Sequence, residues 1–448
     1  MSRYHFIGLG GIGMSALARL LLQQGEEVQG SDAKMSPLLD QLREEGAEID
    51  AALGKGMIVV YSTDIREGHP ERVKARELDL PILHRSDLLD RLIGDKKGLL
   101  VAGTHGKTTT TALLASVLLE AGYDPSFVIG GIGTSLRTNG KAGLGEYFVA
   151  EADESDGSFL KTNGYGAIVT NLEDEHLPFW KHSAALDRAF AQFFSQVKEP
   201  RFLLWCADDD RLQALRPAGS SYGFSPMADW MIDSFRSREG GICFDLKHED
   251  KVYREIQVSL MGRHNALNSA AVFALSIQLG IAEEAVRRAL QQFSGVCRRL
   301  EWKGAAKGID VYDDYGHHPT EISVTVTALK ERIGERRLVV LFQPHRYSRV
   351  QDLFAEFEKS FDQADRVILT DIYSAGEAPI EGITTKTLWA QMGKRLGSKL
   401  HHLSRDRLEE AMAAQIIAGD VVLTIGAGDV TQVAELLLQR LRSADVFA

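Results

Sequence analysis

The sequence has few cysteines and no long apolar run. Only three of its 448 residues are cysteine (Cys206, Cys243 and Cys297), and they form no C-x-x-C pair. This argues against a disulfide framework and against a thiolate zinc site. No apolar stretch approaches the length of a membrane span, and the first glycines come too early for the apolar core of a signal peptide. We expect a cytoplasmic protein with no membrane partner.

Basic residues are fewer than acidic ones, with 51 lysines and arginines against 62 aspartates and glutamates. Low-complexity tracts and fixed-period repeats are absent. The formal net charge is −11, which argues against non-specific binding to nucleic acid. An anionic ligand must then be attracted by local groups and not by the global field. The hydrophobic and charged contents of 44% and 25% are ordinary for globular domains. The length suits about three domains, which we place at 1–96, 97–297 and 298–448.

The stretch from Gly98 to Gly122 has the order strand, glycine turn and helix, with an apolar run before the turn and helical spacing after it. This order directs backbone N–H groups and the positive end of a helix at one point, which suits a phosphate. Lys107 would add its charge against the β- and γ-phosphates, and Thr108 would ligate Mg²⁺. The alternative is a Gly/Thr-rich turn in an ordinary α/β unit, because the general phosphate-loop pattern requires a glycine where Val101 stands. The candidate nucleotide-binding residues here are Gly103, Thr104, His105, Gly106, Lys107, Thr108 and Thr109.

A second glycine-rich turn lies near the N-terminus. Gly8, Gly10 and Gly13 follow a predicted strand at 4–7, and Asp32 stands roughly 20 residues further on, as in dinucleotide-binding proteins. The pattern indicates a diphosphate near a helix N-terminus more surely than it indicates nicotinamide. A nicotinamide dinucleotide, a UDP-sugar and a purely structural turn all stay open at this point.

Polar side chains follow two further predicted strands. Glu151 opens an acidic run after the strand at 147–150, and it is either a Mg²⁺ ligand or part of a solvated loop. His176 follows the strand at 167–170 and is either a ligand or a hydrogen-bonded loop residue. Asn265 and Asn268 share one face of a predicted helix, where they either satisfy backbone groups or contact an adenine edge.

The last third of the chain predicts another doubly wound α/β unit. Strand-like runs at 338–343, 366–373 and 421–425 alternate with helical patterns at 350–361, 385–395, 405–417 and 430–442. Arg346 and Arg349 have the planar fork that binds a carboxylate or phosphate, although surface arginines would show the same pattern. The paired Asp313-Asp314 and His317-His318 do not indicate a dinuclear metal site, because neighbours on an extended chain point to opposite sides.

Taken together, the motifs resemble the Mur ligases, the ATP-dependent enzymes that build the peptidoglycan stem peptide. The resemblance covers essentially the whole chain, and its last three motifs are specific to the alanine-adding branch. It implies an α/β protein of three domains: a Rossmann-like UDP-sugar domain, a P-loop-type ATPase domain with a mostly parallel sheet, and a Rossmann-like amino-acid domain. The motifs are FIGLGGIGMS (6–15), AGTHGKTTTT (102–111), EADESD (151–156), GRHNALN (262–268), CRRLE (297–301), DDYGHHPTE (313–321), FQPHRYSR (342–349) and SAGEAPI (374–380).

The same resemblance implies a reaction and replaces nicotinamide by a UDP-sugar. L-alanine would be joined to the lactyl carboxylate of UDP-N-acetylmuramate through an acyl phosphate, with ATP and two Mg²⁺ ions. Two rivals remain: a related ligase that adds a preformed peptide, and a protein of another class, either an NAD-dependent oxidoreductase or a nucleotide-sensing regulator. The sequence does not distinguish a monomer from a dimer.

Site residues carry over from the family motifs. Lys107 would contact the phosphates, Thr108 and Glu151 would hold one Mg²⁺, and His176 would hold the second. The chain departs from the family here, since Glu175-His176 replaces the usual Asp-His and Pro178 removes a carboxylate. The implied catalytic residues are Lys107, Glu151, His176, Arg299 and Asp314; Asn265, Asn268, Arg299 and Asp314 join the phosphate loop in binding ATP; the substrate side is Gly10, Gly11, Gly13, Met14, Ser15, Asp32, Ser62, Arg85, Ser86, Tyr315, His317, Arg346 and Arg349.

Overall fold

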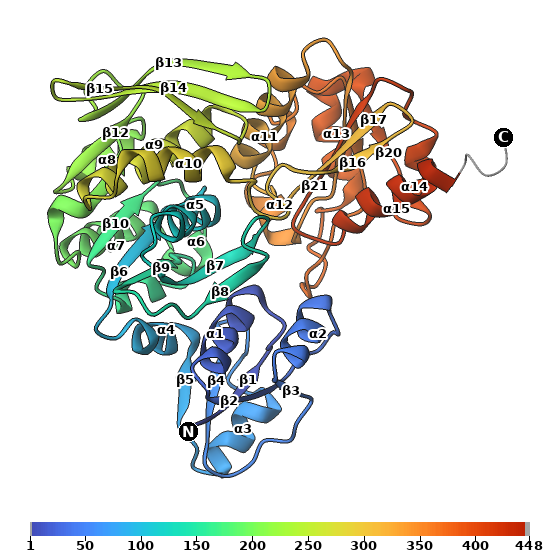
Figure 1. The fold of residues 1–448 in the computed structure, drawn as a ribbon. Coiled ribbons are helices and arrows are strands. Elements are labelled where there is room, and N and C mark those ends of the chain that lie inside the picture. Colours follow the sequence, from blue (N-terminus) through green and yellow to red (C-terminus); the bar gives the residue numbers. More distant parts are fainter. Residues whose placement is uncertain (1, 444–448) are drawn as a thin grey trace. The chain divides into compact units, whose positions relative to one another are not determined.

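The computed structural model describes residues 2–443. The chain forms two compact units, and each is described by itself. The first holds the residues through Arg236 together with Cys243–Ser259 and Asn265–Val296. The second holds Ser237–Ile242, Leu260–His264 and the described residues from Cys297 onward. Three sheets carry the chain, two in the first unit and one in the second (Figure 1).

The N-terminal sheet has the order β3-β2-β1-β4-β5, and all of its strand pairs are parallel. Parallel strands align their carboxyl ends along one edge, so the turn after β1 and the residue after β2 meet there. The elements are β1 (Arg3–Ile7), α1 (Ile12–Gln23), β2 (Glu27–Ser31), α2 (Pro37–Glu44), β3 (Glu48–Ile49), β4 (Met57–Tyr61), α3 (Pro70–Glu77), β5 (Ile82–His84) and α4 (Arg85–Ile93).

The second sheet of the first unit has ten strands in the order β15-β14-β13-β12-β11-β10-β6-β9-β7-β8. Its centre is parallel, with β6 between β10 and β9. Its elements are β6 (Lys97–Ala102), α5 (Lys107–Glu120), β7 (Ser126–Gly133), β8 (Thr138–Lys141), β9 (Tyr147–Glu151), β10 (Gly166–Val169), α6 (Leu177–Trp180), α7 (Ser183–Ser195), β11 (Leu203–Cys206), α8 (Asp210–Leu215), β12 (Ser220–Gly223), β13 (Trp230–Arg238), β14 (Gly241–His248), β15 (Lys251–Val258), α9 (Arg263–Gln278) and α10 (Glu283–Gln292).

Helix α1 joins the two sheets of the first unit through a buried polar seam. The amide of Asn139, on β8, donates to the carbonyl of Ile12 at 2.7 Å and to the hydroxyl of Ser15 at 2.9 Å. Arg19 donates to the side-chain oxygen of the same asparagine. Asn139 is fully buried and Arg19 is 4% exposed, so the first sheet is anchored to the second by groups that are almost completely shielded from water.

The sheet of the second unit has the order β16-β17-β21-β18-β19-β20, parallel except for the β16–β17 hairpin. Apolar side chains fill both of its faces, which are covered by helices. The elements are β16 (Glu301–Ala306), β17 (Ile309–Asp314), α11 (Pro319–Ile333), β18 (Leu338–Phe342), α12 (Tyr347–Asp352), β19 (Arg366–Leu369), α13 (Thr385–Leu396), β20 (Leu400–His402), α14 (Leu408–Ala413), β21 (Val421–Ile425) and α15 (Thr431–Ser443).

Two predicted helices of this unit are shorter than the sequence pattern suggested. The helix expected at 350–361 ends at Asp352, and Phe357 and Phe361 instead pack on Phe342 with ring centroids 5.5 and 5.1 Å away. The helix expected at 405–417 begins only at Leu408, because Arg407 has a φ of 53°. Helix α11 was not among the predicted elements.

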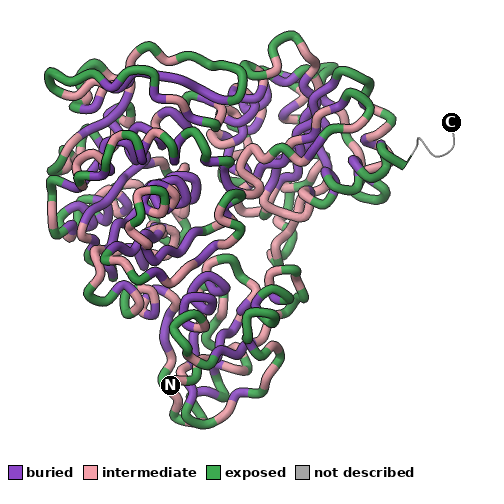
Figure 2. The backbone as a smooth tube through the Cα atoms, in the orientation of Figure 1, coloured by how far each residue is buried: buried purple, intermediate pink, exposed green. Residues whose placement is uncertain are grey.

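The central strands are buried along most of their length, whereas the outer helices and loops are exposed (Figure 2). The two units thus have the covered, mostly parallel sheets of α/β proteins. Within residues 2–443, no helix combines the length and apolar character needed to cross a membrane.

Candidate active site

The turn between β6 and α5 can be built only from glycine at two positions. Gly103 has a φ of +124°, and a Cβ atom there would lie 2.2 Å from the hydroxyl oxygen of Thr170. Gly106 has a φ of +85°, and a Cβ atom would lie 2.9 Å from the side-chain oxygen of Asn268. The backbone therefore turns tightly before α5, and the first N–H groups of the helix, which have no acceptor within the helix, lie at this turn.

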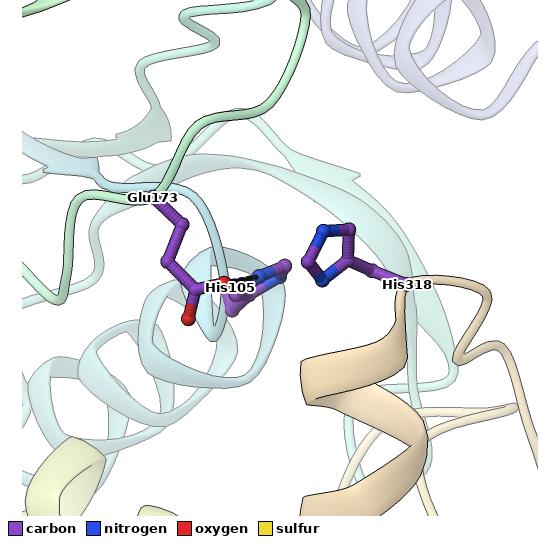
Figure 3. A group of neighbouring side chains, drawn as sticks. All are labelled: His105, Glu173 and His318. Atoms are coloured by element: carbon purple, nitrogen blue, oxygen red, sulfur yellow. Dashed lines mark ion pairs between the residues drawn. The ribbon is translucent and has the colours of Figure 1, made fainter. Parts of the chain in front are cut away.

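The loop after β10 holds this turn in place. The side-chain oxygen of Asn171 accepts from the backbone N–H of His105 at 2.8 Å, and its amide donates to the carbonyl of His105 at 3.0 Å. The hydroxyl of Thr170 donates to that carbonyl at 2.6 Å. The His105 ring forms an ion pair with Glu173 at 3.5 Å, drawn as a dashed line in Figure 3. Neighbouring strand ends thus fix the turn before any ligand arrives.

Lys107 is the first residue of α5 and is folded back over the turn. Its Nζ donates to both carboxylate oxygens of Glu154, at 2.8 and 3.1 Å, to the carbonyl of Thr104 at 3.0 Å, and to that of Gly103. Burial alone would lower the pKa of Lys107, but the carboxylates of Glu154 and Asp153 raise it above its ordinary value. Burial raises the pKa of Glu154 to about 7, against the opposing charge of Lys107. Lys107 is therefore a fixed cation at the start of the helix.

Two oxygen ligands suited to Mg²⁺ lie beside this lysine. The hydroxyl of Thr108 donates to Glu151 at 3.3 Å, and the other carboxylate oxygen of Glu151 accepts from the N–H of Gly130 at 2.5 Å. A hydroxyl and a carboxylate are donors that Mg²⁺ prefers, so these residues fit the implied metal. His176 precedes α6 with a φ of 58°, and its Nε2 lies 3.9 Å from Glu175.

Asn265 and Asn268 are buried on α9, and their side chains bind each other at 3.1 Å. Because Asn268 also lies against Gly106, the pair borders the phosphate turn. This geometry is compatible with both alternatives raised by the sequence, a structural role and an adenine contact.

The N-terminal glycine turn is organised by Asp32. Its carboxylate accepts from the N–H of Gly10 at 2.8 Å and from that of Lys34 at 3.1 Å. Gly11 and Gly13 lie at the start of α1. The hydroxyl of Ser15 is used within the buried seam, donating to the carbonyl of Ile12 at 3.0 Å, and Met14 is buried. Asp32 therefore shapes the turn, and the side chains of Met14 and Ser15 are buried beside it.

Arg85, the first residue of α4, reaches the acidic run of the second sheet. Its guanidinium pairs with Asp153 at 2.6 Å and lies 3.8 Å from Asp156. Although burial opposes ionisation, the charges of Arg85 and Lys107 hold the pKa of Asp153 well below its usual range. Ser86 binds the ring of His84 at 2.6 Å, and Ser62 follows β4.

A cavity of about 240 Å³ lies between α1, α4 and the strands β7 and β9. Its walls are mainly apolar, with Arg85, Asp153 and Glu151 as the charged groups. Gly13, from the N-terminal turn, lies at the same cavity as Glu151, from the phosphate-loop domain. The cavity therefore extends from the N-terminal turn to Glu151, the carboxylate that accepts from Thr108 at the start of α5.

The residues that the sequence predicts to bind the amino-acid substrate lie close together within the second unit. The Tyr315 ring lies edge-on to the His317 ring, with 5.5 Å between the ring centroids. The centroids of the His317 and His345 rings are 6.1 Å apart. The guanidinium of Arg349 is 3.2 Å from the His345 ring, and Arg346 precedes α12 with a φ of 68°. This cationic cluster suits a carboxylate.

Asp314, at the end of β17, is buried and accepts from the N–H groups of Leu300 and Gly316 at 2.6 and 2.7 Å. Burial raises its pKa to about 6, while the charge of Arg299 acts in the opposite direction. Arg299 lies 3.6 Å from Glu321 and 5.1 Å from the centre of the Tyr315 ring. Asp314 thus ties the segment around Arg299 to the end of the strand.

His345 should make the second unit sensitive to acid. Burial and the nearby charges of His317, Arg349 and Arg346 lower its pKa to about 3. The unfolded chain takes up a proton near its ordinary pKa of about 6.5 and the folded chain does not, so stability is lost as the pH falls. We expect His345→Gln to reduce the loss of unfolding free energy between pH 7 and pH 5 by on the order of 1 to 2 kcal/mol. Urea unfolding of both proteins at each pH measures this, and equal losses would contradict it.

Sequence reasoning missed the partners of the two central cations. The sequence pattern indicates only Glu151 within the acidic run, whereas in the structure Glu154 binds Lys107 and Asp153 binds Arg85. Asn171 and Thr170, which hold the phosphate turn, were also missed. Their position at the end of the strand predicted at 167–170 is the available signal.

Fold and site define a mostly parallel α/β protein in which a glycine turn precedes a helix after β1 and again after β6. Three family models match it: "Mur ligase family, catalytic domain" over residues 3–97, "Mur ligase middle domain" over 101–276, and "Mur ligase, glutamate ligase domain" over 298–428. The chain belongs to the Mur ligase family. The predictions of the family and of a three-domain α/β fold are therefore confirmed.

Relatives and solved structures agree with this assignment. The UDP-N-acetylmuramate–L-alanine ligase of Protochlamydia amoebophila is 44% identical over 99% of both chains. That of Geobacter sp. (strain M21) is 42% identical, over 99% of this chain and 98% of its own. The crystal structure of the Thermotoga maritima UDP-N-acetylmuramate–alanine ligase superposes with a TM-score of 0.86 at 29% identity, covering 99% of this chain and 100% of that one. A murein peptide ligase from Psychrobacter arcticus shares the fold, with a TM-score of 0.71 at 23% identity over 98% and 99% of the two chains.

Proposed function

We propose that this protein is an ATP-dependent ligase that joins L-alanine to the lactyl carboxylate of UDP-N-acetylmuramate in the synthesis of peptidoglycan precursors. The observation that carries the proposal is the cavity bordered both by Gly13 of the N-terminal turn and by Glu151 beside the phosphate loop. A diphosphate at the first turn would direct the attached sugar acid through this cavity toward the phosphate loop. The full-length similarity to alanine-adding ligases supports the same reaction.

The proposed chemistry has two steps. An oxygen of the lactyl carboxylate attacks the γ-phosphorus of ATP, which gives an acyl phosphate and ADP. The amine of L-alanine then attacks the acyl carbon and phosphate leaves. Bound Mg²⁺ would neutralise phosphate charge, and Thr108, Glu151 and His176 are the residues proposed to hold the two ions.

The chain's own groups account for positioning and for the remaining charge. Lys107 and the N-terminus of α5 stabilise the phosphates, since attack by a carboxylate brings like charges together. Arg85 would orient the lactyl carboxylate, and the cluster around Arg346 and Arg349 would bind the carboxylate of L-alanine. For the nucleotide we propose Asn265, Asn268, Arg299 and Asp314. For the UDP-sugar we propose Gly10, Gly11, Gly13, Met14, Ser15, Asp32, Ser62 and Ser86, and Tyr315 and His317 join the two arginines on the substrate side.

Domain boundaries at 96/97 and 297/298 and a cytoplasmic location form part of this proposal. The boundaries fall close to the limits of the matching family models. A cytoplasmic location is proposed because the reaction would consume ATP and a UDP-linked sugar.

Phosphate release tests the function. Purified protein with ATP and Mg²⁺ should release phosphate only when UDP-N-acetylmuramate and an amino acid are both present, with L-alanine preferred over glycine and L-serine. Preference for a preformed tripeptide would instead indicate the peptide-adding ligase. Phosphate release that needs no amino acid would refute both ligase functions and favour a nucleotide-sensing regulator.

A further inference from the structure

The acidic segment after β9 uses two adjacent carboxylates to bind two different cations. Glu154 accepts from Lys107 through both oxygens, at 2.8 and 3.1 Å. Asp153 accepts from Arg85 at 2.6 Å. Under the proposed function, Lys107 and Arg85 are the groups that meet the γ-phosphate and the lactyl carboxylate. Each cation is therefore already paired in the ligand-free protein.

Lys107 has no N–H left for a phosphate in this arrangement. An ammonium has three donors, and here they serve the carbonyls of Gly103 and Thr104 and the carboxylate of Glu154. The carbonyls lie three and four residues before the lysine within its own turn. Glu154 is the acceptor from another segment, so it is the one that a phosphate oxygen would replace.

Hydrogen bonds to the backbone of Glu154 and to the side chain of Asp156 hold the segment Asp153–Asp156 in place. The backbone carbonyl of Glu154 accepts from the indole N–H of Trp180 at 3.0 Å. The carboxylate of Asp156 accepts from the hydroxyl of Thr63 and from the N–H of Ser158. Glu154 is 1% exposed, so water does not compete for its carboxylate. The pairs with Lys107 and Arg85 are thus specific contacts of a fixed segment and not those of a solvated acidic run.

We propose that the segment Asp153–Asp156 is a charge latch, in which Glu154 holds Lys107 and Asp153 holds Arg85 until the nucleotide phosphate and the substrate carboxylate displace them. This inference rests on the proposed function and deepens it. Both acids are positioning residues: they act on the substrates through the cation that each one holds. The nucleotide phosphate replaces Glu154 as the partner of Lys107, and the substrate carboxylate replaces Asp153 as the partner of Arg85.

Two neutral variants of equal size separate the two halves of the latch. Glu154→Gln should lower the Kd of a non-hydrolysable ATP analogue with Mg²⁺ by about tenfold, because the phosphate no longer competes with a carboxylate. Asp153→Asn should lower the Kd of UDP-N-acetylmuramate by a similar factor. Each variant should leave the Kd of the other ligand within about twofold, and so should the control Glu146→Gln, whose carboxylate pairs with Lys97 near the protein surface.

Isothermal titration calorimetry of the full-length protein gives all of these constants. A double variant tests whether Glu154 acts through Lys107. In a Lys107→Ala background, Glu154→Gln should no longer lower the Kd of the ATP analogue. If Glu154→Gln does not fold, Glu154→Asp, which keeps the charge on a shorter arm, should give a smaller gain of the same sign.

The latch is overturned if the neutral variants weaken their ligands, leave both affinities unchanged, or tighten both ligands alike. It is also overturned if the gain from Glu154→Gln persists without Lys107. These failures are distinct from failure of the proposed function, in which the unmodified protein would not bind UDP-N-acetylmuramate or would release no phosphate.

Discussion

Replacing Lys107 with alanine is expected to slow turnover by roughly a hundredfold or more while UDP-N-acetylmuramate still binds. The ammonium is a fixed charge at the start of α5, where a carboxylate has to approach a triphosphate. Removing it takes away charge stabilisation that is needed most in the transition state. UDP-sugar binding should persist because the N-terminal turn is held by Asp32, in another sheet.

Phosphate release and calorimetry measure the two effects separately. Lys107→Ala also leaves Glu154 buried without its partner, which costs stability. The variant Lys107→Ala/Glu154→Gln removes that cost, so turnover that stays low in the double variant reports the missing charge and not a damaged fold. Lys161→Ala, which removes an exposed lysine paired with Asp87, is the matched control and should keep full activity. Near-normal turnover of Lys107→Ala would remove this lysine from the mechanism.

Gly103→Ala is expected to abolish tight nucleotide binding, with a loss of affinity for an ATP analogue of roughly a hundredfold. The new Cβ would stand 2.2 Å from the Thr170 hydroxyl and 2.9 Å from the carbonyl oxygen of Asn171, and the φ of +124° is unfavourable for alanine. The turn must move, and its N–H groups then no longer converge on one point. We also expect a loss of unfolding free energy on the order of 3 kcal/mol.

Gly122→Ala is the control for this substitution. Gly122 follows the same helix and has a φ of +79°. Apart from its neighbours along the chain, no atom of residues 2–443 lies within 4 Å of the position that a Cβ would occupy there. The change should therefore cost only about 1 kcal/mol of stability and leave nucleotide affinity unchanged. Calorimetry with the ATP analogue and urea unfolding compare the two variants. Similar nucleotide affinities in both would show that the shape of the turn at Gly103 does not matter for the phosphate.

Local patterns predicted the parts of the site that lie within one strand–turn–helix unit. Gly103, Gly106, Lys107 and Thr108 follow each other in sequence, and their geometry depends mainly on β6 and α5. Asp32 was likewise predicted at the N-terminal turn, because parallel strands bring their carboxyl ends to one edge.

The sequence could not predict contacts that depend on how separate segments pack. Nothing in the run from Glu151 to Asp156 distinguishes the acid that meets Lys107 from the one that meets Arg85, which is 68 residues from Asp153. The early end of α12 also depends on how separate segments pack. The amphipathic pattern continues to Phe361, but packing of the two phenylalanines on Phe342 outweighs helical propensity.

The seam between α1 and β8 bears on how the chain folds during synthesis. Arg19 and Ser15 leave the ribosome long before Asn139, at a delay of several seconds for typical elongation rates of about 5–20 residues per second. Until then, Arg19 can pair with Glu45, 2.6 Å away in the finished structure, but it lacks its second acceptor, the side-chain oxygen of Asn139. The N-terminal sheet therefore completes this part of its packing only after the nascent chain has delivered β8. Because of the order of translation, the polar contacts of α1 are complete only after β8 of the second sheet has been synthesised.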